Sequence, residues 1–420
     1  MAAWCGITFV SGDSNPLYVA HRIFLNGSEV KDLVIPSTVT SIGSAAFMWC
    51  TGITSVTIPN SVTSIGASAF NGCTNLPSVN IPNSVTSIGP FAFCNCTGFT
   101  TLDIPNGVTT IEEGAFSDCS NLNSVAIPAS LTYVGNDAFK GCSNLKSVHI
   151  SDIAAWCNIS FSNESASPLL IAHHLFMNGS EVKELVIPSN VTAISNYAFN
   201  GCSYFTSIDI GNSVKTIGWR AFQDCQRLTS LNIGNNVTSI GLCAFNRCTS
   251  LTNLTIPNSV TSIEEWAFAN CASLENFIIP NSVTTIKSNA FDGCSSLTSM
   301  TVPNSVTHLG TLTFTYCTNL TTIESLIEEP FAFGSNLVDD FSKVILFVPA
   351  GTKSKYESTD GWKRFHHIVE GSPAHVDEGL QVENDVSTIY NLNGHRIVSP
   401  QRGINIVRTK DGKIKKVLVK

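Results

Sequence analysis

Cysteine and histidine are the residues of this chain whose types and spacing most directly suggest chemistry. Cys5 and His21 stand sixteen residues apart, and Cys157 and His173 repeat the pair at the same spacing. A cysteine becomes a nucleophile when a nearby histidine takes its proton, so each pair is a candidate for cysteine-dependent hydrolysis. No acid pair, oxyanion-hole turn or phosphate loop accompanies them, and G-x-S-x-G, H-E-x-x-H and G-K-[ST] are absent. We therefore expect no enzyme, unless Cys157 and His173 lie within hydrogen-bond reach in a water-accessible cleft.

Most of the fifteen cysteines share a single register. The members of this column are Cys50, Cys73, Cys96, Cys119, Cys142, Cys202, Cys225, Cys248, Cys271, Cys294 and Cys317. A disulfide ladder is one interpretation, but no C-x-x-C pair occurs, the total of fifteen is odd, and pairing neighbours would leave one cysteine over. A free cysteine is a small side chain that proteins bury readily. We expect buried thiols, and no metal or cofactor site.

The cysteine column marks a repeat. Its eleven units begin at Ile35, Ile58, Ile81, Ile104, Ile127, Ile187, Ile210, Ile233, Ile256, Ile279 and Val302. Within each run the spacing is 23 residues, and the shared pattern is I-P-x-x-V-x-x-I-x-x-x-A-F-x-x-C-x-x-L-x-x-V-x. A period in the twenties with regularly placed aliphatic residues is typical of a leucine-rich-repeat solenoid, in which each unit forms one coil, or rung.

One unit illustrates the elements that this pattern predicts. The residues expected in its core are Val62, Ile65, Phe70, Leu76, Val79 and Ile81. The stretch 76–81 has apolar residues at alternate positions and predicts a short strand, which Pro82 and Asn83 end. The segment 68–73, "SAFNGC", is too short for a helix and predicts a tight turn. The predicted fold is a repeat solenoid of short parallel strands and tight turns.

The sequence also contains a longer repeat, with a period of 152 residues, that includes several of the shorter units. "AAWCGITFVSGDSNPLYVAHRIFLNGSEVKDLVIP" from Ala2 matches "AAWCNISFSNESASPLLIAHHLFMNGSEVKELVIP" from Ala154 without a gap. Both copies end on the ordinary L-x-x-V-x-I-P pattern with the leucine and valine exchanged, so we interpret about 1–34 and 150–186 as enlarged rungs of a single solenoid over 1–324. In them "AAWC" indicates an apolar patch, and the histidine of "AH" is expected to cap a strand.

Composition and charge exclude some classes of protein. The formal charge is −8, 13% of residues are charged, and no basic stripe appears in the first 370 residues, so we expect no nucleic-acid partner. No apolar run reaches the roughly 18–20 residues that span a bilayer, so we expect no transmembrane segment. Met1 leads into "AAWCGITF" without the features of a signal peptide, and this start resembles the interior of a repeat.

Two surfaces are candidates for binding. The outward strand positions form polar columns that include Asp103, His149, Asp209 and Asn232, and they either hold a partner's polar groups or are simply solvated. The turn before A-F varies more, and there Tyr197, Trp219, Arg220 and Trp266 fall on units close together. Aromatic and arginine residues of this kind either pack partly against neighbouring turns or form an exposed ridge, which is the composition that interface anchors prefer.

The repeat decays beyond Glu324. Residues 325–370 are expected to cap the solenoid, with one strand and an amphipathic segment that contains Tyr356, Trp362 and Phe365. Residues 371–386 are acidic and lack a period, which is typical of a linker. Residues 387–420 carry eight basic residues and one acidic residue, a net charge of +7, and predict a small β module with turns at 393–394 and 411–412.

The motif "IPNSVTSIGASAFNGCTNL", the enlarged rung "SNPLYVAHRIFLNGSEVKDLVIP" and the cap "VPAGTKSKYESTDGWKRF" together resemble the BspA-like leucine-rich-repeat surface proteins of Bacteroidetes and some mucosal protozoa. The tail, with "IYNLNGHRI" and "KKVLVK", resembles the sorting domains of type IX secretion. The resemblance implies a secreted or surface-attached protein that adheres to extracellular or host protein, or to a glycan. It implies no catalytic residue and no cofactor. The alternative is a structural spacer of the cell envelope without a specific ligand.

Overall fold

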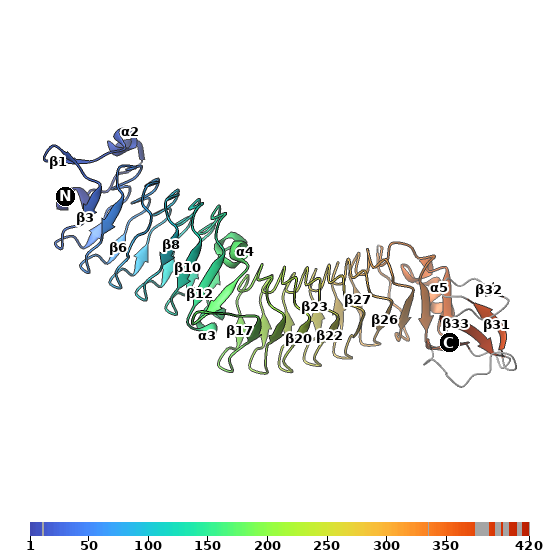
Figure 1. Cartoon of the computed structure of the whole chain (residues 1–420). Coiled ribbons are helices and arrows are strands. Elements are labelled where there is room, and N and C mark those ends of the chain that lie inside the picture. Colours follow the sequence, from blue (N-terminus) through green and yellow to red (C-terminus); the bar gives the residue numbers. More distant parts are fainter. Residues whose placement is uncertain are drawn as a thin grey trace. The chain divides into compact units, whose positions relative to one another are not determined.

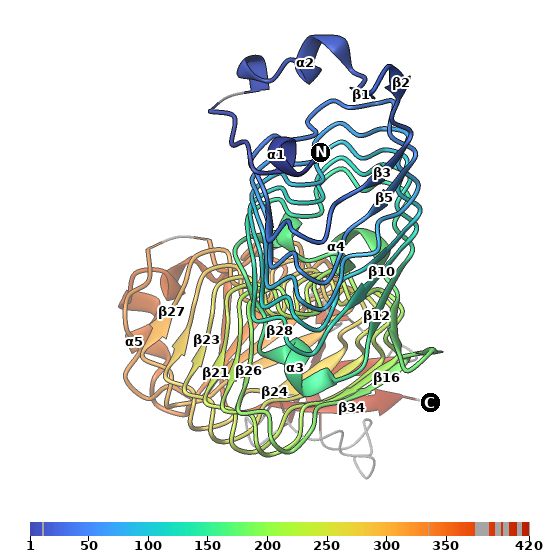
Figure 2. The same cartoon turned by 90° about the vertical axis from the view of Figure 1, so that its left-hand side faces the viewer.

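The chain folds into stacked coils. The computed structural model describes residues 1–10, 12–334 and 336–373 and the strand segments 386–390, 396–397, 403–409 and 414–419. It divides into two compact units, Met1–Leu228 and Thr229–Lys420 (Figure 1). Within each unit the strands of successive rungs lie side by side, one rung behind the next (Figure 2). The predicted repeat solenoid of 23-residue units with short parallel strands and tight turns is confirmed.

The first line of strands immediately precedes the I-P turn. In the first unit it consists of β3 (Asp32–Val34), β5 (Ser55–Thr57), β8 (Thr101–Asp103), β10 (Ser124–Ile127), β12 (Ser147–Ile150), β14 (Leu175–Met177), β16 (Glu184–Val186) and β18 (Ser207–Asp209). In the second unit it consists of β20 (Ser230–Asn232), β22 (Asn253–Thr255), β24 (Asn276–Ile278), β26 (Ser299–Val302), β28 (Thr322–Ser325), β29 (Ile345–Val348) and β30 (His367–Glu370). The pairing is parallel with a shift of one repeat, so Val125 pairs with Val148. Equivalent residues therefore stack on one another.

A second line of strands was not predicted. It runs through the "TSI" positions, and in the first unit consists of β4 (Ser41–Ile42), β6 (Ser64–Ile65), β7 (Ser87–Ile88), β9 (Thr110–Ile111), β11 (Tyr133–Val134), β13 (Ser160–Phe161), β17 (Ala193–Ile194) and β19 (Thr216–Ile217). In the second unit it consists of β21 (Ser239–Ile240), β23 (Ser262–Ile263), β25 (Thr285–Ile286) and β27 (His308–Leu309). Two residues are too few for an alternating pattern to appear in the sequence.

The strand predicted within 76–81 does not form. That rung keeps only an isolated bridge between Thr57 and Asn80. In other rungs, the residue at the position equivalent to Pro77 donates its backbone N–H to a carbonyl of the preceding rung. Thr54, for example, donates to the carbonyl of Lys31 at 2.8 Å. Proline has no N–H to donate, so the ladder is interrupted at this rung.

The core is a stack of equivalent side chains. All six core residues predicted for the repeat that begins at Ile58, from Val62 to Ile81, are buried, with exposed fractions of 0–6%. The phenylalanines of the A-F pairs stack along the coils, and the ring centroids of Phe93 and Phe116 lie 5.6 Å apart at an interplanar angle of 1°. The coils above and below therefore enclose each of these side chains, as the sequence predicted.

The turn that contains A-F carries a hydrogen-bond ladder of its own. In each of the eleven repeat units two residues adopt positive φ, one before the alanine, whose place Thr313 takes in the last unit, and one before the cysteine. Before alanine they are Ala45, Ser68, Phe91, Gly114, Asp137, Tyr197, Arg220, Cys243, Trp266, Asn289 and Leu312. Before cysteine they are Trp49, Gly72, Asn95, Asp118, Gly141, Gly201, Asp224, Arg247, Asn270, Gly293 and Tyr316. These residues donate to the next rung, as Tyr197 does to the carbonyl of Trp219 at 2.8 Å. Because backbone groups make this ladder, the side chain before alanine can vary.

The enlarged rungs add short helices and a hairpin. The second copy contains α3 (Ile153–Cys157), η2 (Glu164–Ala166), α4 (Leu169–Ala172) and β15 (Ser180–Glu181), which pairs with β14. The first copy contains α1 (Ala2–Cys5), η1 (Gly12–Ser14), α2 (Leu17–Ala20), β1 (Phe24–Leu25) and β2 (Ser28–Glu29). Each hairpin turns at Asn-Gly with positive φ at both residues, as a tight hairpin requires. His173 follows α4 in the left-handed region, so it caps a helix and not a strand as predicted.

The two copies carry different polar residues at a position that is buried in both. In the first copy the Asn15 side chain donates to the carbonyls of Ala45 and Ala46 and accepts from Leu17 N–H at 2.9 Å. Its equivalent is Ser167, whose Oγ is buried and, among the described residues, has no hydrogen-bond partner; the same holds for the amide of Asn200.

We expect Ser167→Asn to raise the free energy of unfolding by about 1 kcal/mol, because a longer amide reaches the equivalent carbonyls and the buried polar atoms gain partners. Urea unfolding of the full chain measures this difference. The reciprocal change, Asn15→Ser, is the matched control and should lower the free energy by a similar amount. A destabilised Ser167→Asn variant would show that the second copy has no room for the amide.

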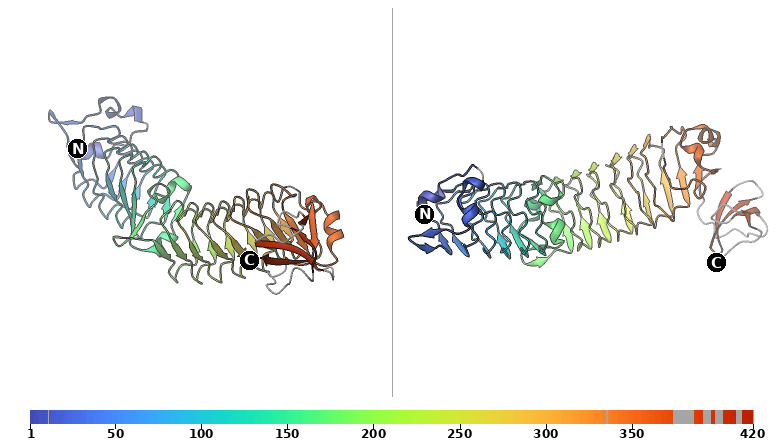
Figure 3. Two further views of the ribbon diagram at one scale, coloured as in Figure 1. Left: turned by 45° about the vertical axis from the view of Figure 1, so that its right-hand side comes forward. Right: turned by 90° about the horizontal axis from the view of Figure 1, so that it is seen from above.

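The end of the second unit carries a cap and a small sheet. The cap contains α5 (Lys353–Ser358) and η3 (Trp362–Arg364), which Figure 3 shows in orange beside the last strands. Tyr356, Trp362 and Phe365 are at most 4% exposed. The sheet is antiparallel and has the order β32 (Arg396–Ile397), β31 (Val386–Tyr390), β33 (Gly403–Thr409) and β34 (Ile414–Val419). Most of the predicted linker (374–385) and the predicted turns at 393–394 and 411–412 lie outside the described residues. Among the described helices, none has the length and apolar character to cross a bilayer.

Candidate functional site

The two cysteine–histidine pairs do not have the features of a nucleophilic site. Cys157 lies on α3 with no exposed surface, and burial raises the pKa of its thiol to about 12. His173 is exposed, and its Nδ1 lies 2.8 Å from the carbonyl oxygen of Gly201. Cys5 is also fully buried with a raised pKa, again because of desolvation. A nucleophilic cysteine needs an accessible thiolate, so this arrangement weighs against cysteine-dependent hydrolysis.

The cysteine column has a structural role that the sequence did not reveal. All fifteen cysteines are buried and none forms a disulfide, which confirms the expectation of buried thiols. Thiols in the column also donate to the carbonyl oxygen of the phenylalanine in the preceding rung, at 3.2 Å for Cys73 to Phe47 and for Cys119 to Phe93. Cysteine therefore fills the core and satisfies a carbonyl lone pair. Within the described part of the chain, no group of three or more His, Cys, Asp or Glu side chains could hold a metal ion.

The predicted polar columns lie on the outer face of the first strand line. Asp103 and His149 share one line in the first unit, with Ala126 between them in register. Asp103 is exposed, whereas His149 is half-buried because the Phe176 ring of the enlarged rung stacks on it with centroids 4.9 Å apart. Asp209 is exposed on β18, and Asn232 is exposed on β20 of the second unit.

The predicted aromatic ridge is partly assembled. Tyr197, Trp219 and Arg220 lie on adjacent rungs of the first unit, where Trp219 is 54% exposed and Tyr197 is half-buried. The Arg220 guanidinium forms an ion pair with Glu164 of η2. Trp266 belongs to the second unit and is half-buried at the register of Tyr197 and Arg220, whereas Trp219 stands one position earlier. The four residues therefore occupy two registers.

The structure also contains a cluster of aromatic and charged side chains that was not predicted from the sequence. The His174 ring forms a hydrogen bond with the Glu181 carboxylate, and the centroids of the His174 and Tyr204 rings lie 3.7 Å apart. The Arg227 guanidinium lies over the Tyr204 ring, 5.1 Å from the ring centroid. Tyr204 and Arg227 are one repeat apart, so their shared register could have indicated their contact. The partner of Arg220, Glu164, has no such signal because it comes from the enlarged rung.

Comparison with known proteins agrees with this architecture. The family model described as BspA type leucine rich repeat region matches residues 40–167, 170–271 and 238–329. Comparison with curated proteins finds no match. A leucine-rich repeat protein from Bacteroides ovatus is 28% identical over 69% of this chain and 90% of that chain, with a TM-score of 0.42. A leucine rich cell surface protein from Faecalibacterium prausnitzii is 27% identical over 71% of this chain and 80% of that chain, with a TM-score of 0.40. The family model spans more than half of the sequence, and the chain therefore belongs to the BspA-type leucine-rich repeat proteins.

Proposed function

We propose that this protein is a non-enzymatic scaffold that binds an extracellular or host protein through the variable turn edge of its solenoid. Leucine-rich repeat proteins are generally scaffolds for protein interaction, and the repeat frame supplies a rigid surface on which side chains can be exchanged. The cysteine and phenylalanine columns are buried, which leaves the turn and outer strand positions to contact a partner.

Trp219 is the observation that supports this proposal most. An indole ring that is 54% exposed stands on a turn whose backbone is fixed by the ladder between rungs. Arg220 beside it is held by Glu164, and Tyr197 lies on the preceding rung. Tryptophan, tyrosine and arginine are the residues that most often dominate binding energy at interfaces, and a rigid backbone lowers the entropy cost of binding.

We expect the wild-type chain to bind at least one protein in a panel of immobilised host extracellular matrix proteins, and Trp219→Ala to weaken that binding about tenfold or more. Surface plasmon resonance on the full chain measures both affinities. Tyr316→Ala is the matched control, because Tyr316 is 68% exposed on a turn of the second unit. Equal affinity of the wild type and Trp219→Ala would exclude the ridge. Absence of binding across the panel would favour the structural spacer.

The C-terminal sheet supports a proposal for localisation. We propose that residues 387–420 direct export to the cell surface, because their antiparallel sheet and net charge of +7 set them apart from the acidic solenoid. Removing these residues is expected to leave the protein inside the cell, as fractionation and immunoblotting would show. Unchanged surface display of the truncated chain would remove this role. We also propose a Bacteroidetes source, because the repeat motif resembles the BspA-like surface proteins of Bacteroidetes and the tail resembles the sorting domains of type IX secretion.

A further inference from the structure

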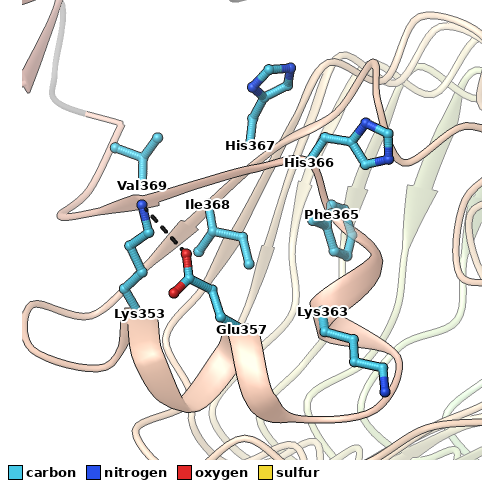
Figure 4. Close-up of a pocket in the computed structure, with 8 residues that line it drawn as sticks. All are labelled: Lys353, Glu357, Lys363, Phe365, His366, His367, Ile368 and Val369. Carbon is cyan, nitrogen blue, oxygen red and sulfur yellow. Dashed lines mark ion pairs between the residues drawn. The ribbon is translucent and has the colours of Figure 1, made fainter.

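The cap contains a pocket that the proposed scaffold function does not use. It has a volume of about 440 Å³, within the range of ligand pockets, and α5, η3 and β30 surround it (Figure 4). Phe365 and Ile368 line it but are largely buried, with 4% and 7% of their surface exposed, so its accessible surface is mainly polar. Lys353 and Lys363 come from the helical segments, His367 is the first residue of β30, and His366 directly precedes it.

The pocket lies along β30, the last strand of a parallel sheet. Strand order in this sheet ends at β30, so its outer edge pairs with no strand that the structure describes. Gly371 N–H donates inward to the carbonyl of Val348 at 2.9 Å. Successive residues of a strand direct their backbone groups to opposite edges, so Ile368 and Glu370 present N–H and C=O groups outward. An open edge of this kind is a template for another strand.

The charges around the pocket favour an acidic ligand. Four basic or titratable nitrogen side chains line it, against one carboxylate, Glu357. Lys353 pairs with Glu357 at 3.7 Å and Lys363 pairs with Asp360 at 2.6 Å, and all four side chains are at least 45% exposed. Exposed ion pairs contribute little stability, so a ligand carboxylate can replace these partners at small cost. The excess of basic side chains at the pocket contrasts with the acidic balance of residues 1–386, which carry a net charge of −15.

We propose that the outer edge of β30 binds an extended peptide with carboxylate side chains, supplied by a partner protein, as an additional strand. Backbone hydrogen bonds join the peptide to Ile368 and Glu370. Its acidic side chains contact Lys353 and Lys363. This site belongs to the cap and is independent of the ridge at Trp219.

The test uses the full chain and a fluorescein-labelled ten-residue peptide of alternating Glu and Val, followed by fluorescence anisotropy. We expect it to bind about tenfold or more tightly than a peptide of alternating Lys and Val. The double variant Lys353→Ala/Lys363→Ala should weaken binding about tenfold or more, and circular dichroism checks its fold. The matched control is Lys343→Ala/Lys355→Ala, which removes the same charge from the cap outside the pocket.

A second probe separates strand pairing from attraction between charges. The same Glu-Val peptide with alternate amides N-methylated cannot form the ladder, and we expect it to bind about tenfold or more weakly. Three results would overturn the proposal: no binding of the Glu-Val peptide, equal binding of the N-methylated peptide, or equal losses in the two double variants. Binding that appears only after Asp377, Glu378, Glu383 and Asp385 are neutralised would assign the site to the chain's own acidic segment and would also overturn it.

Discussion

Above about pH 9, the protein is expected to lose stability steeply and to unfold cooperatively. Burial raises the pKa of column thiols, to about 12 for Cys142, Cys271 and Cys317 and to about 11 for Cys50, from an ordinary value near 9. The folded state thus keeps protons that the unfolded state releases. The stabilisation is fully present below pH 9 and falls as the pH rises toward the pKa of the folded state.

The expected magnitude is large because many thiols act together. Each buried thiol removes up to about 1.4 kcal/mol per pH unit above the pKa of the unfolded state, so several thiols can exceed the stability of a typical domain within two units. Circular dichroism during urea unfolding at pH 7–11 gives the slope. Replacing Cys96, Cys119 and Cys142 by valine should make this slope shallower, since three titrating groups are lost. An unchanged slope would mean that other groups control alkaline unfolding.

Replacing Phe116 by alanine is expected to lower the free energy of unfolding by about 3–5 kcal/mol. Phe116 is fully buried between Phe93 and Phe139, with ring centroids 5.6 Å and 5.7 Å away. The adjacent rungs are held by strand pairing and by the turn ladder, so they cannot close around the cavity. The loss therefore includes the transfer of the ring to water and the lost contacts on both of its faces.

Urea unfolding at pH 7 measures the effect of Phe116→Ala. The matched control is Phe24→Ala, because Phe24 is 60% exposed and its removal should change the free energy by about 0.5 kcal/mol or less. Phe116→Leu should fall between the two. If Phe116→Ala and Phe24→Ala behave alike, the phenylalanine stack contributes no more than an exposed ring.

Sequence periodicity predicted the solenoid because the fold repeats the same local problem at each rung. A 23-residue unit cannot bury Val62, Phe70 and Cys73 alone, but a copy stacked above and below can. The second strand line was not predicted because each of its strands has only two residues. The strand predicted at 78–80 is absent because Pro77 lacks a backbone N–H. A lost N–H matters only once the neighbouring rung's carbonyl is known to need it.

The candidate ridge was only partly predictable. The sequence identified the variable turn and the aromatic residues in it, and the frequent Gly, Asn and Asp before cysteine could have indicated left-handed backbone there. It could not distinguish the exposed Trp219 from the half-buried Tyr197, since one register step changes the direction of a side chain in a turn. Nor could it assign Glu164 to Arg220, because that ion pair joins an enlarged rung to a regular one.

The sequence by itself determined which aliphatic, phenylalanine and cysteine side chains of the repeat are buried and how the rungs repeat, because burial of these side chains follows the period and requires no knowledge of a particular neighbour. The tertiary structure alone decided what the polar atoms do. In the folded chain the column thiols donate to phenylalanine carbonyls, and His173 caps a helix. The outer edge of β30 has no partner strand among the described residues and lies beside Lys353 and Lys363. Hydrogen bonds and ion pairs form only when atoms of residues far apart in the sequence are placed to within a few tenths of an ångström, and only the folded backbone sets those positions.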